Sequence, residues 1–262
     1  MERHITSLTT LSFAFTLISL KIGYTATFSC PAGLLAISNK LCVLRVEESV
    51  NYCEAHRICY REGLRRGLRM FLMGKNVDIL GNDVRDVVLR IYGIHALLQN
   101  MKSLQPGWMY SDPGCSVCVS ARGTTFWRDG EPNGRGKERV VMCNYEGCVD
   151  VAQHNATGPF VCEVSNHPMP NRWTATRYLT DWPVKITDPF MPDHRNQGCF
   201  RTLKVSSILL CSLKCQITDV CRSFYYNSQG GHCYLTLYVD SRLPRSMMIA
   251  QGTWVRYAKP DY

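Results

Sequence analysis

The chain has 262 residues with 14 cysteines and a formal net charge of +9. So many cysteines at short spacings indicate a disulfide framework, which excludes a reducing compartment such as the cytosol. The positive charge is spread widely and is not interleaved with aromatic residues, which excludes the usual footprint of a nucleic-acid-binding protein.

The N-terminus predicts secretion. Residues 5–20 are mostly apolar, follow Arg3 and lead into small residues near Gly23, so we expect a signal peptide over residues 1–26. The alternative is an uncleaved anchor, but about sixteen apolar residues are short for a bilayer span of about twenty. The mature protein is then expected to be extracellular, with no membrane span.

The remainder of the chain is expected to fold as two domains, from the usual domain size. Prolines concentrate between Ser165 and Gly198 and interrupt regular patterns there. We predict a first domain over residues 27–165, a linker over 166–171 and a second domain over 172–262. Residues 177–186 alternate in the manner of a strand.

Cysteine spacing and periodicity predict the first elements. Cys30 and Cys42 bracket a short hairpin. Residues 50–62 carry apolar or aromatic side chains at helical spacing, which predicts an amphipathic helix with Cys59 facing inward. Gly63 is expected to end this helix.

A concentration of basic residues lies on and after the same segment. Its members are Arg57, Arg61, Arg65, Arg66, Arg69 and Lys75. The favoured interpretation is a solvated helix face, partly neutralised by Glu54 and Glu62; the alternative is a site for sulfated or otherwise anionic glycans.

Five short motifs follow one another in the first domain. They are Cys30-Pro31-x-Gly33 with Cys42, Ala55-x3-Cys59-x3-Gly63, Trp108-Met109-Tyr110-Ser111-Asp112, Trp127-x-x-Gly130-Glu131-Pro132-Asn133 and Phe160-Val161-Cys162-Glu163. In this order they resemble the C-type lectin-like domain. The resemblance implies an α+β fold with two helices and small antiparallel sheets, stapled by the disulfides Cys30–Cys42 and Cys59–Cys162.

The same resemblance implies one calcium site. In the family, Glu-Pro-Asn contains a cis proline, and its carboxylate and amide bind both Ca²⁺ and the vicinal hydroxyls of a sugar. Oxygen ligands of this kind suit a hard dication. The expected metal and ligand-binding set is Glu131, Asn133, Glu138 and Asp150, with Pro132 shaping the loop, and the Glu-Pro-Asn order implies mannose, N-acetylglucosamine or fucose-type glycans.

The chain departs from the family pattern in two places. Val149 replaces an asparagine that would ligate calcium, and the loss of this ligand keeps open a loop that binds nothing. Val140 occupies the place of a family cysteine. Cys143 and Cys148 instead predict a tight turn bridged by its own disulfide.

Other features of the first domain are read from local spacing. Cys115 and Cys118 are interpreted as pairing with each other, pairing with Cys53, or chelating a metal, zinc being the weakest option. Asn155-Ala156-Thr157 is an N-glycosylation sequon in a polar segment that should be exposed.

The second domain has the pattern Cys-x3-Cys-x5-Cys-x-x-Phe-x-Tyr-x6-Cys-x-Leu, starting at Cys211. It resembles the PAN/apple domain, a small α+β module that binds proteins or glycans. The resemblance implies the pairs Cys211–Cys233 and Cys215–Cys221. Cys199 has no obvious partner in this domain and is expected to join a cysteine of the first domain or of a second chain, which leaves a disulfide-linked dimer open.

No catalytic motif accompanies these modules, so we expect a binding protein rather than an enzyme. One hypothesis is a secreted, calcium-dependent lectin for glycans or glycoproteins. The other is a calcium-independent adhesion or protein-binding module built on two disulfide scaffolds. The intact Glu131-Pro132-Asn133 favours the first, and Val149 favours the second.

Overall fold

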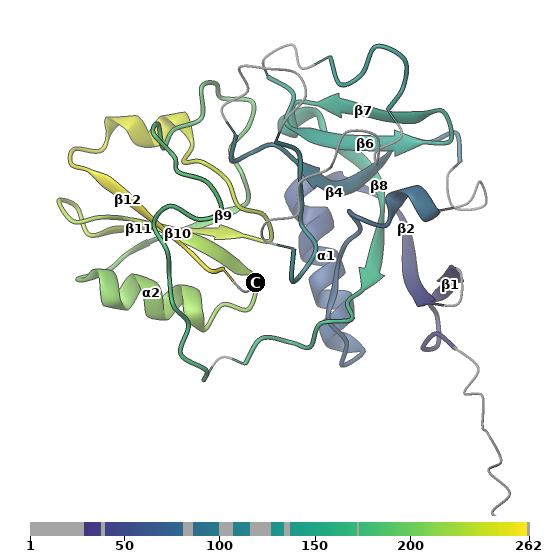
Figure 1. Cartoon of the computed structure of the whole chain (residues 1–262), viewed down its shortest axis with the longest axis horizontal. Helices are drawn as coiled ribbons and strands as arrows, with labels where there is room; N and C mark the ends of the chain where they lie inside the picture. Colours follow the sequence, from purple (N-terminus) through teal and green to yellow (C-terminus); the bar gives the residue numbers. More distant parts are fainter. Residues whose placement is uncertain are drawn as a thin grey trace, which may run out of the picture.

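The computed structural model describes residues 29–37, 40–80, 86–99, 107–115, 127–133, 137–171 and 173–260. The predicted signal peptide and Cys118 lie outside these residues. Two modules lie side by side in Figure 1: an N-terminal module from β1 to β8 with helix α1, and a C-terminal module from β9 to β12 with helix α2. No helix in the described part of the chain has the length and apolar character needed to cross a membrane.

The N-terminal module is built on one mixed sheet. Its strands are β1 (Leu35–Ile37), β2 (Leu41–Asn51), β3 (Met70–Leu72), β4 (Arg90–His95), β5 (Met109–Tyr110), β6 (Val140–Asn144), β7 (Gly147–Val151) and β8 (Thr157–Val164). They run in the order β1-β2-β8-β4-β6-β7, with β3 paired to β8 and β5 to β4. β4 and β8 pair in parallel, and the other described pairs are antiparallel.

Both faces of this sheet are buried. Along β8, Phe160 and Cys162 pack in the cluster that contains α1, whereas Val161 packs in the cluster on the other face. Along β6, Val140 and Val141 divide between the same two clusters. This follows from the period of two, which sends neighbouring side chains of a strand to opposite faces.

Helix α1 (Tyr52–Arg65) starts where Asn51 caps it, its Oδ1 accepting from the Glu54 N–H at 3.0 Å. The expectation that Gly63 ends the helix is wrong, because the helix continues to Arg65. Gly63 serves close packing instead: a Cβ there would lie 2.7 Å from both Leu68 O and Met70 N. The residue lets the chain that leads into β3 approach the last helical turn.

Several basic residues on and just after α1 pair with nearby acidic side chains. Arg57 pairs with Glu54, and Arg65 and Arg66 both pair with Glu62. Such solvent-exposed pairs contribute only about 0–1 kcal/mol each. They match the solvated-face interpretation, and the anionic-glycan interpretation stays a prediction.

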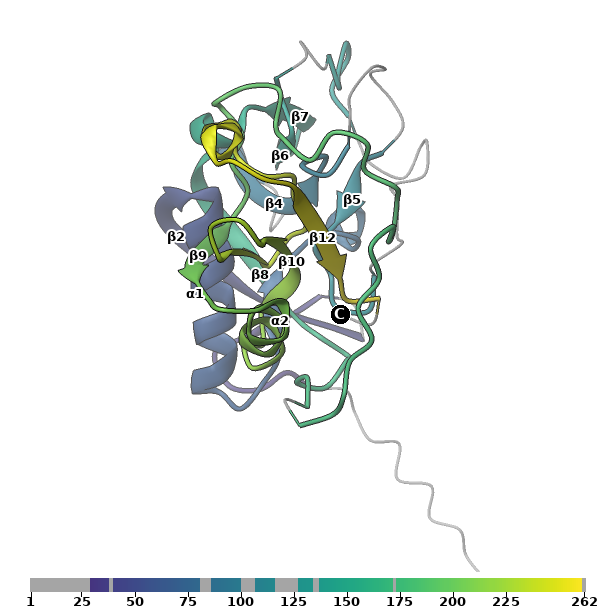
Figure 2. The same ribbon diagram turned by 90° about the vertical axis from the view of Figure 1, so that its left-hand side faces the viewer.

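The C-terminal module is an antiparallel sheet with a helix on one face (Figure 2). It contains β9 (Phe200–Lys204), α2 (Ile208–Gln216), β10 (Cys221–Asn227), β11 (His232–Leu237) and β12 (Trp254–Ala258), in the sheet order β12-β10-β11-β9. Phe224 packs with the cysteines of α2, and Tyr225 packs on the opposite face. The mixed α/β composition matches the expected α+β class.

The disulfides confirm most of the predicted pairing. Those that match are Cys30–Cys42, Cys59–Cys162, Cys143–Cys148, Cys211–Cys233 and Cys215–Cys221. Cys115 is also disulfide-bonded, so the alternative in which it chelates a metal is wrong.

The two modules share a covalent and apolar interface. Cys53 of α1 bonds to Cys199 in the same chain, which confirms a first-domain cysteine as the partner of Cys199 and makes the alternative of a second chain wrong. Met191, Cys199 and Val239 extend the α1 cluster of the N-terminal module. The modules are thus one packed body.

The strand predicted over residues 177–186 does not form. Leu179 makes only an isolated bridge to Ala258 of β12. The segment then reaches the cis Trp182–Pro183 bond, and proline has no N–H to continue a ladder. Short 3-10 segments lie at Val77–Ile79, Gln153–Asn155 and Arg245–Ile249.

Candidate functional site

The Glu131-Pro132-Asn133 loop is anchored on β7. Trp127 forms a bridge with Cys148, and the Arg128 N–H donates to Cys148 O at 3.0 Å. The Trp127 ring is half-buried and lies 5.3 Å from the ring of Trp108, as expected of a core residue beneath the loop. Gly130, with φ of 82°, supplies the left-handed turn that leads into Glu131.

The loop brings three of the predicted ligands together. The Asn133 N–H donates to Glu131 Oε2 and to Asp150 Oδ1, both at 3.0 Å. The Asn133 side-chain amide donates to Glu131 Oε1 at 2.8 Å. The Glu131–Pro132 bond is cis, as the family resemblance implies. Residues 17 positions apart in sequence therefore meet in one polar cluster.

Electrostatics favour an ionised carboxylate in this cluster. Burial acts to raise the pKa of Glu131, but hydrogen bonds with Asp150 and with the Asn133 backbone and side chain outweigh it and lower the pKa. Asp150 is itself buried. A carboxylate that hydrogen bonds keep ionised is a favourable partner for a cation.

Carboxylate and amide oxygens at this position fit calcium in part. They are the ligand types that Ca²⁺ takes, although it needs six to eight oxygens in all. Glu138 is half-buried two residues before β6. Within the described ranges no group of three or more histidine, cysteine, aspartate or glutamate side chains forms a metal-holding cluster, so solvent or a bound ligand would have to supply much of the shell.

Val149 faces away from this cluster. It packs with Val151 against the α1 core, whereas its neighbour Cys148 belongs to the cluster on the other side of the sheet. Alternation along β7 thus directs Val149 opposite to Asp150. The valine contributes to packing and offers the loop no oxygen.

The predicted glycosylation site is sterically open. Asn155 ends the 3-10 segment Gln153–Asn155 and is exposed, as is Thr157. This matches the exposure expected from the sequence.

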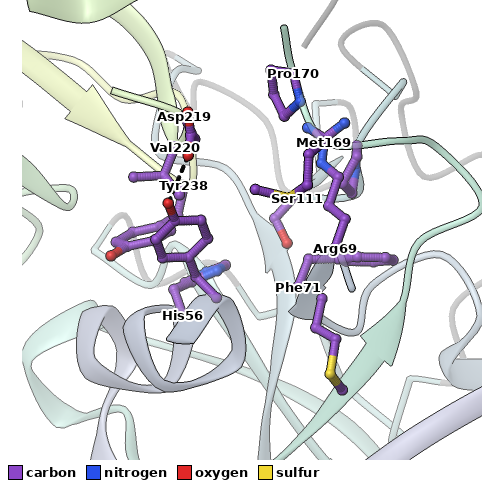
Figure 3. Close-up of a pocket in the computed structure, with 12 residues that line it drawn as sticks. His56, Arg69, Phe71, Ser111, Met169, Pro170, Asp219, Val220 and Tyr238 are labelled. Carbon is purple, nitrogen blue, oxygen red and sulfur yellow. Dashed lines mark hydrogen bonds between the residues drawn. The ribbon is translucent and has the colours of Figure 1, made fainter. Parts of the chain in front are cut away.

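The pocket of Figure 3 lies in the seam between the modules. His56 of α1 stacks on Tyr238 at 5.6 Å, and the Tyr60 hydroxyl donates to Asp219 at 2.8 Å. Burial holds the pKa of His56 well below its usual range. A cavity of about 20 Å³ has room for about one water, so this is a packing seam rather than a ligand site.

Sequence reasoning missed a second acidic pair, Asp112 and Glu163. Each is the last residue of one of the five short motifs, and the sequence predicted no separate function for either. They line one hollow of about 300 Å³ on the N-terminal module. A carboxylate placed directly after a buried run, as in Val161-Cys162-Glu163, was the available signal.

The fold and the loop define a class of protein. A stapled α1 helix, a sheet centred on β2 and β8, and a cis Glu-Pro-Asn loop held on β7 make the N-terminal module a disulfide-stapled C-type lectin-like fold.

Comparison with known proteins gives matches only among solved structures. No protein-family model and no curated protein matches the chain. The C-type lectin domain of murine dendritic cell inhibitory receptor 2, in complex with an N-glycan, is 19% identical over 53% of this chain and 100% of its own, with a TM-score of 0.39. The C-type lectin CEL-I from Cucumaria echinata is 14% identical over 53% of this chain and 99% of its own, with a TM-score of 0.39.

Herring type II antifreeze protein is also similar, being 12% identical over 54% of this chain and 100% of its own, with a TM-score of 0.38. These similarities concern about half of the chain. The function of this chain is therefore inferred from its own residues.

Proposed function

We propose that this chain is a secreted carbohydrate-binding protein that recognises mannose, N-acetylglucosamine or fucose-type glycans in a calcium-dependent manner through Glu131-Pro132-Asn133. The observation that carries the proposal is the convergence of Glu131, Asn133 and Asp150, with the Asn133 N–H 3.0 Å from both carboxylates.

The chemistry of the loop explains how these residues would act. A bound calcium ion would polarise the vicinal hydroxyls of a sugar and share them with the protein. Glu131 and Asp150 would hold the ion, and Glu138 is assigned to the same set. The Asn133 amide would offer one oxygen to the ion and one N–H to a sugar hydroxyl.

The wider assignment belongs to the same proposal. It comprises a signal peptide over residues 1–26, a lectin-like domain over 27–165, a linker over 166–171 and a PAN/apple-like domain over 172–262. Glycosylation at Asn155 and a binding rather than enzymatic role complete it. Supporting observations are the disulfides, the exposed sequon and the predicted pairing on α2.

A second function is favoured by Val149. Its side chain packs into the α1 core and supplies no ligand, which favours a calcium-independent adhesion or protein-binding module. In that case the loop would keep its shape without calcium, because hydrogen bonds already join Asn133 to Glu131 and to Asp150.

The test is a calcium titration of the full mature chain by calorimetry, followed by retention on a mannan column with and without chelator. The lectin proposal expects saturable calcium binding and chelator-reversible retention. No calcium heat together with no retention refutes it and favours the protein-binding alternative.

Three variants make the test specific. The swap Glu131→Gln with Asn133→Asp keeps the number of carboxylates and should abolish mannan retention while calcium binding persists. Asp150→Asn removes a charged oxygen and should weaken calcium binding by about tenfold or more. Asp129→Asn is the matched control, because Asp129 is an exposed neighbour of the loop and its loss should change neither property.

A further inference from the structure

An acidic hollow of about 300 Å³ lies away from the Glu131 loop, at the end of β8. The residues that matter to its chemistry are Phe71, Lys75, Asn76, Asp112, Glu163 and His167. Lys75 and His167 are exposed, and Asp112 and Glu163 are buried. We call this site the acidic hollow; its size suits a small molecule.

Glu163 lines this space and carries an acceptor that no described residue uses. The residue is 5% exposed, and its Oε1 accepts from the Asn76 side-chain amide at 2.6 Å. Its buried Oε2 has no hydrogen-bond partner among the described residues. A buried carboxylate oxygen without a partner is costly, so a donor supplied from outside would be bound favourably.

Asp112 is held beside it in a fixed orientation. It is 6% exposed, and both of its carboxylate oxygens lie within hydrogen-bond distance of the Lys75 backbone N–H, at 3.1 and 3.2 Å. Burial raises the pKa of Asp112 to about 6, and burial together with Asp112 raises the pKa of Glu163 to about 8. Two neighbouring buried carboxyl groups are stabilised in their ionised form by a shared positive charge.

The oxygen atoms available in the hollow suit an ammonium group better than a metal ion. A primary ammonium has three N–H donors and needs about three acceptors, and Glu163, Asp112 and the Asn76 carbonyl can offer this number. A hard divalent ion would need about six oxygens, and the described residues hold no cluster of three acidic, cysteine or histidine side chains suited to a metal.

We propose that the acidic hollow binds the primary ammonium group of a small polar ligand, with Glu163 and Asp112 as acceptors and Lys75 and His167 at the mouth. The ammonium could come from an amino sugar or from a lysine side chain. Both sources present the same charged donor on a body that a hollow of about 300 Å³ can admit.

The experiment uses the full mature chain in EDTA, so that the Glu131 loop takes no part. Glucosamine and Nα-acetyl-lysinamide are titrated separately and followed by NMR chemical shifts. Each has a matched control in which the ammonium is masked, N-acetylglucosamine and Nα,Nε-diacetyl-lysinamide. Saturable shifts with an amine and none with its acetylated control support the proposal, and the better-bound amine identifies the source. Equal response to amines and controls overturns it.

Variants locate the binding. Glu163→Gln keeps the shape and should weaken amine binding by about tenfold, the scale of one charge-assisted hydrogen bond. Lys75→Gln removes a competing positive charge and should strengthen binding severalfold, a gain that misfolding cannot produce. Unchanged affinity in both variants would place the amine elsewhere and overturn the proposal.

The pH dependence gives an independent readout. Affinity for Nα-acetyl-lysinamide should rise between pH 7 and pH 9 as Glu163 ionises, because Asp112, with a pKa of about 6, is already largely ionised there. Asp112, Lys75, His167 and Arg222 are the other charged or titratable groups around the pair. The rise should persist in His167→Gln and vanish in Glu163→Gln. A last control adds calcium, without EDTA, to a variant that lacks the ligands of the Glu131 loop. If calcium then displaces Nα-acetyl-lysinamide, the hollow is a metal site and the ammonium proposal is overturned.

Discussion

Glu163 should make the protein less stable as pH rises, and Glu163→Gln should remove this dependence. Burial, with the neighbouring Asp112, raises the pKa of Glu163 from 4.5 to about 8. The folded state therefore keeps its proton after the unfolded state has lost it. The stabilisation is complete below pH 4.5 and is lost as pH rises through 8.

The magnitude follows from the pKa difference. At about 1.4 kcal/mol per pH unit, the wild type should lose about 3 to 4 kcal/mol of unfolding free energy between pH 5 and pH 8 relative to Glu163→Gln. Below pH 5 the two proteins should be close in stability, and above pH 8 the glutamine variant should be the more stable.

Urea unfolding with the disulfides intact, at one-unit steps from pH 5 to pH 9, measures this difference. Glu48→Gln is the matched control, because Glu48 is exposed on β2 and its loss should leave the wild-type profile unchanged. Parallel pH profiles for wild type and Glu163→Gln would refute the reasoning, since they would mean that Glu163 ionises alike in both states.

Three further predictions concern other parts of the molecule. Burial, with Arg222 nearby, lowers the pKa of His95 from 6.5 to about 3. Acid should therefore destabilise the wild type by up to about 5 kcal/mol between pH 6.5 and pH 3, relative to His95→Gln. Equal urea-unfolding profiles for the two proteins over this pH range would contradict the prediction. Replacing Cys53 and Cys199 together by alanine should cost about 4 kcal/mol, from loop closure with Cys59–Cys162 intact, and an unchanged urea midpoint would contradict it. Asn155→Gln should raise gel mobility of the secreted protein if the exposed sequon carries a glycan, whereas Asn171→Gln, outside any sequon, should not.

Local spacing predicted much of the fold. Cys143 and Cys148 are close in sequence and form the tip of the β6–β7 hairpin, so their disulfide was readable from the residues. The cis Glu131–Pro132 loop was likewise inferred from a short motif.

Long-range packing could not be predicted in the same way. Cys53 and Cys199 are 146 residues apart and belong to no common motif, so several partners stayed open until the modules were placed together. The burial of Glu163 depends on Asn76 and Asp112, which reach it from distant segments. Residues 177–186 have a strand-like pattern, but a neighbouring sheet edge engages them only at Leu179.

The Cys53–Cys199 bond also has a consequence for biosynthesis. Residues 27–165 contain nine cysteines and residues 166–262 contain five, so each half has an odd number. The first half therefore cannot complete its disulfides until Cys199 has emerged from the ribosome and entered the oxidising compartment. A fragment that contains either half alone would have one unpaired thiol. A disulfide-linked dimer of such a fragment would therefore result from the missing half and would not be a property of the intact protein.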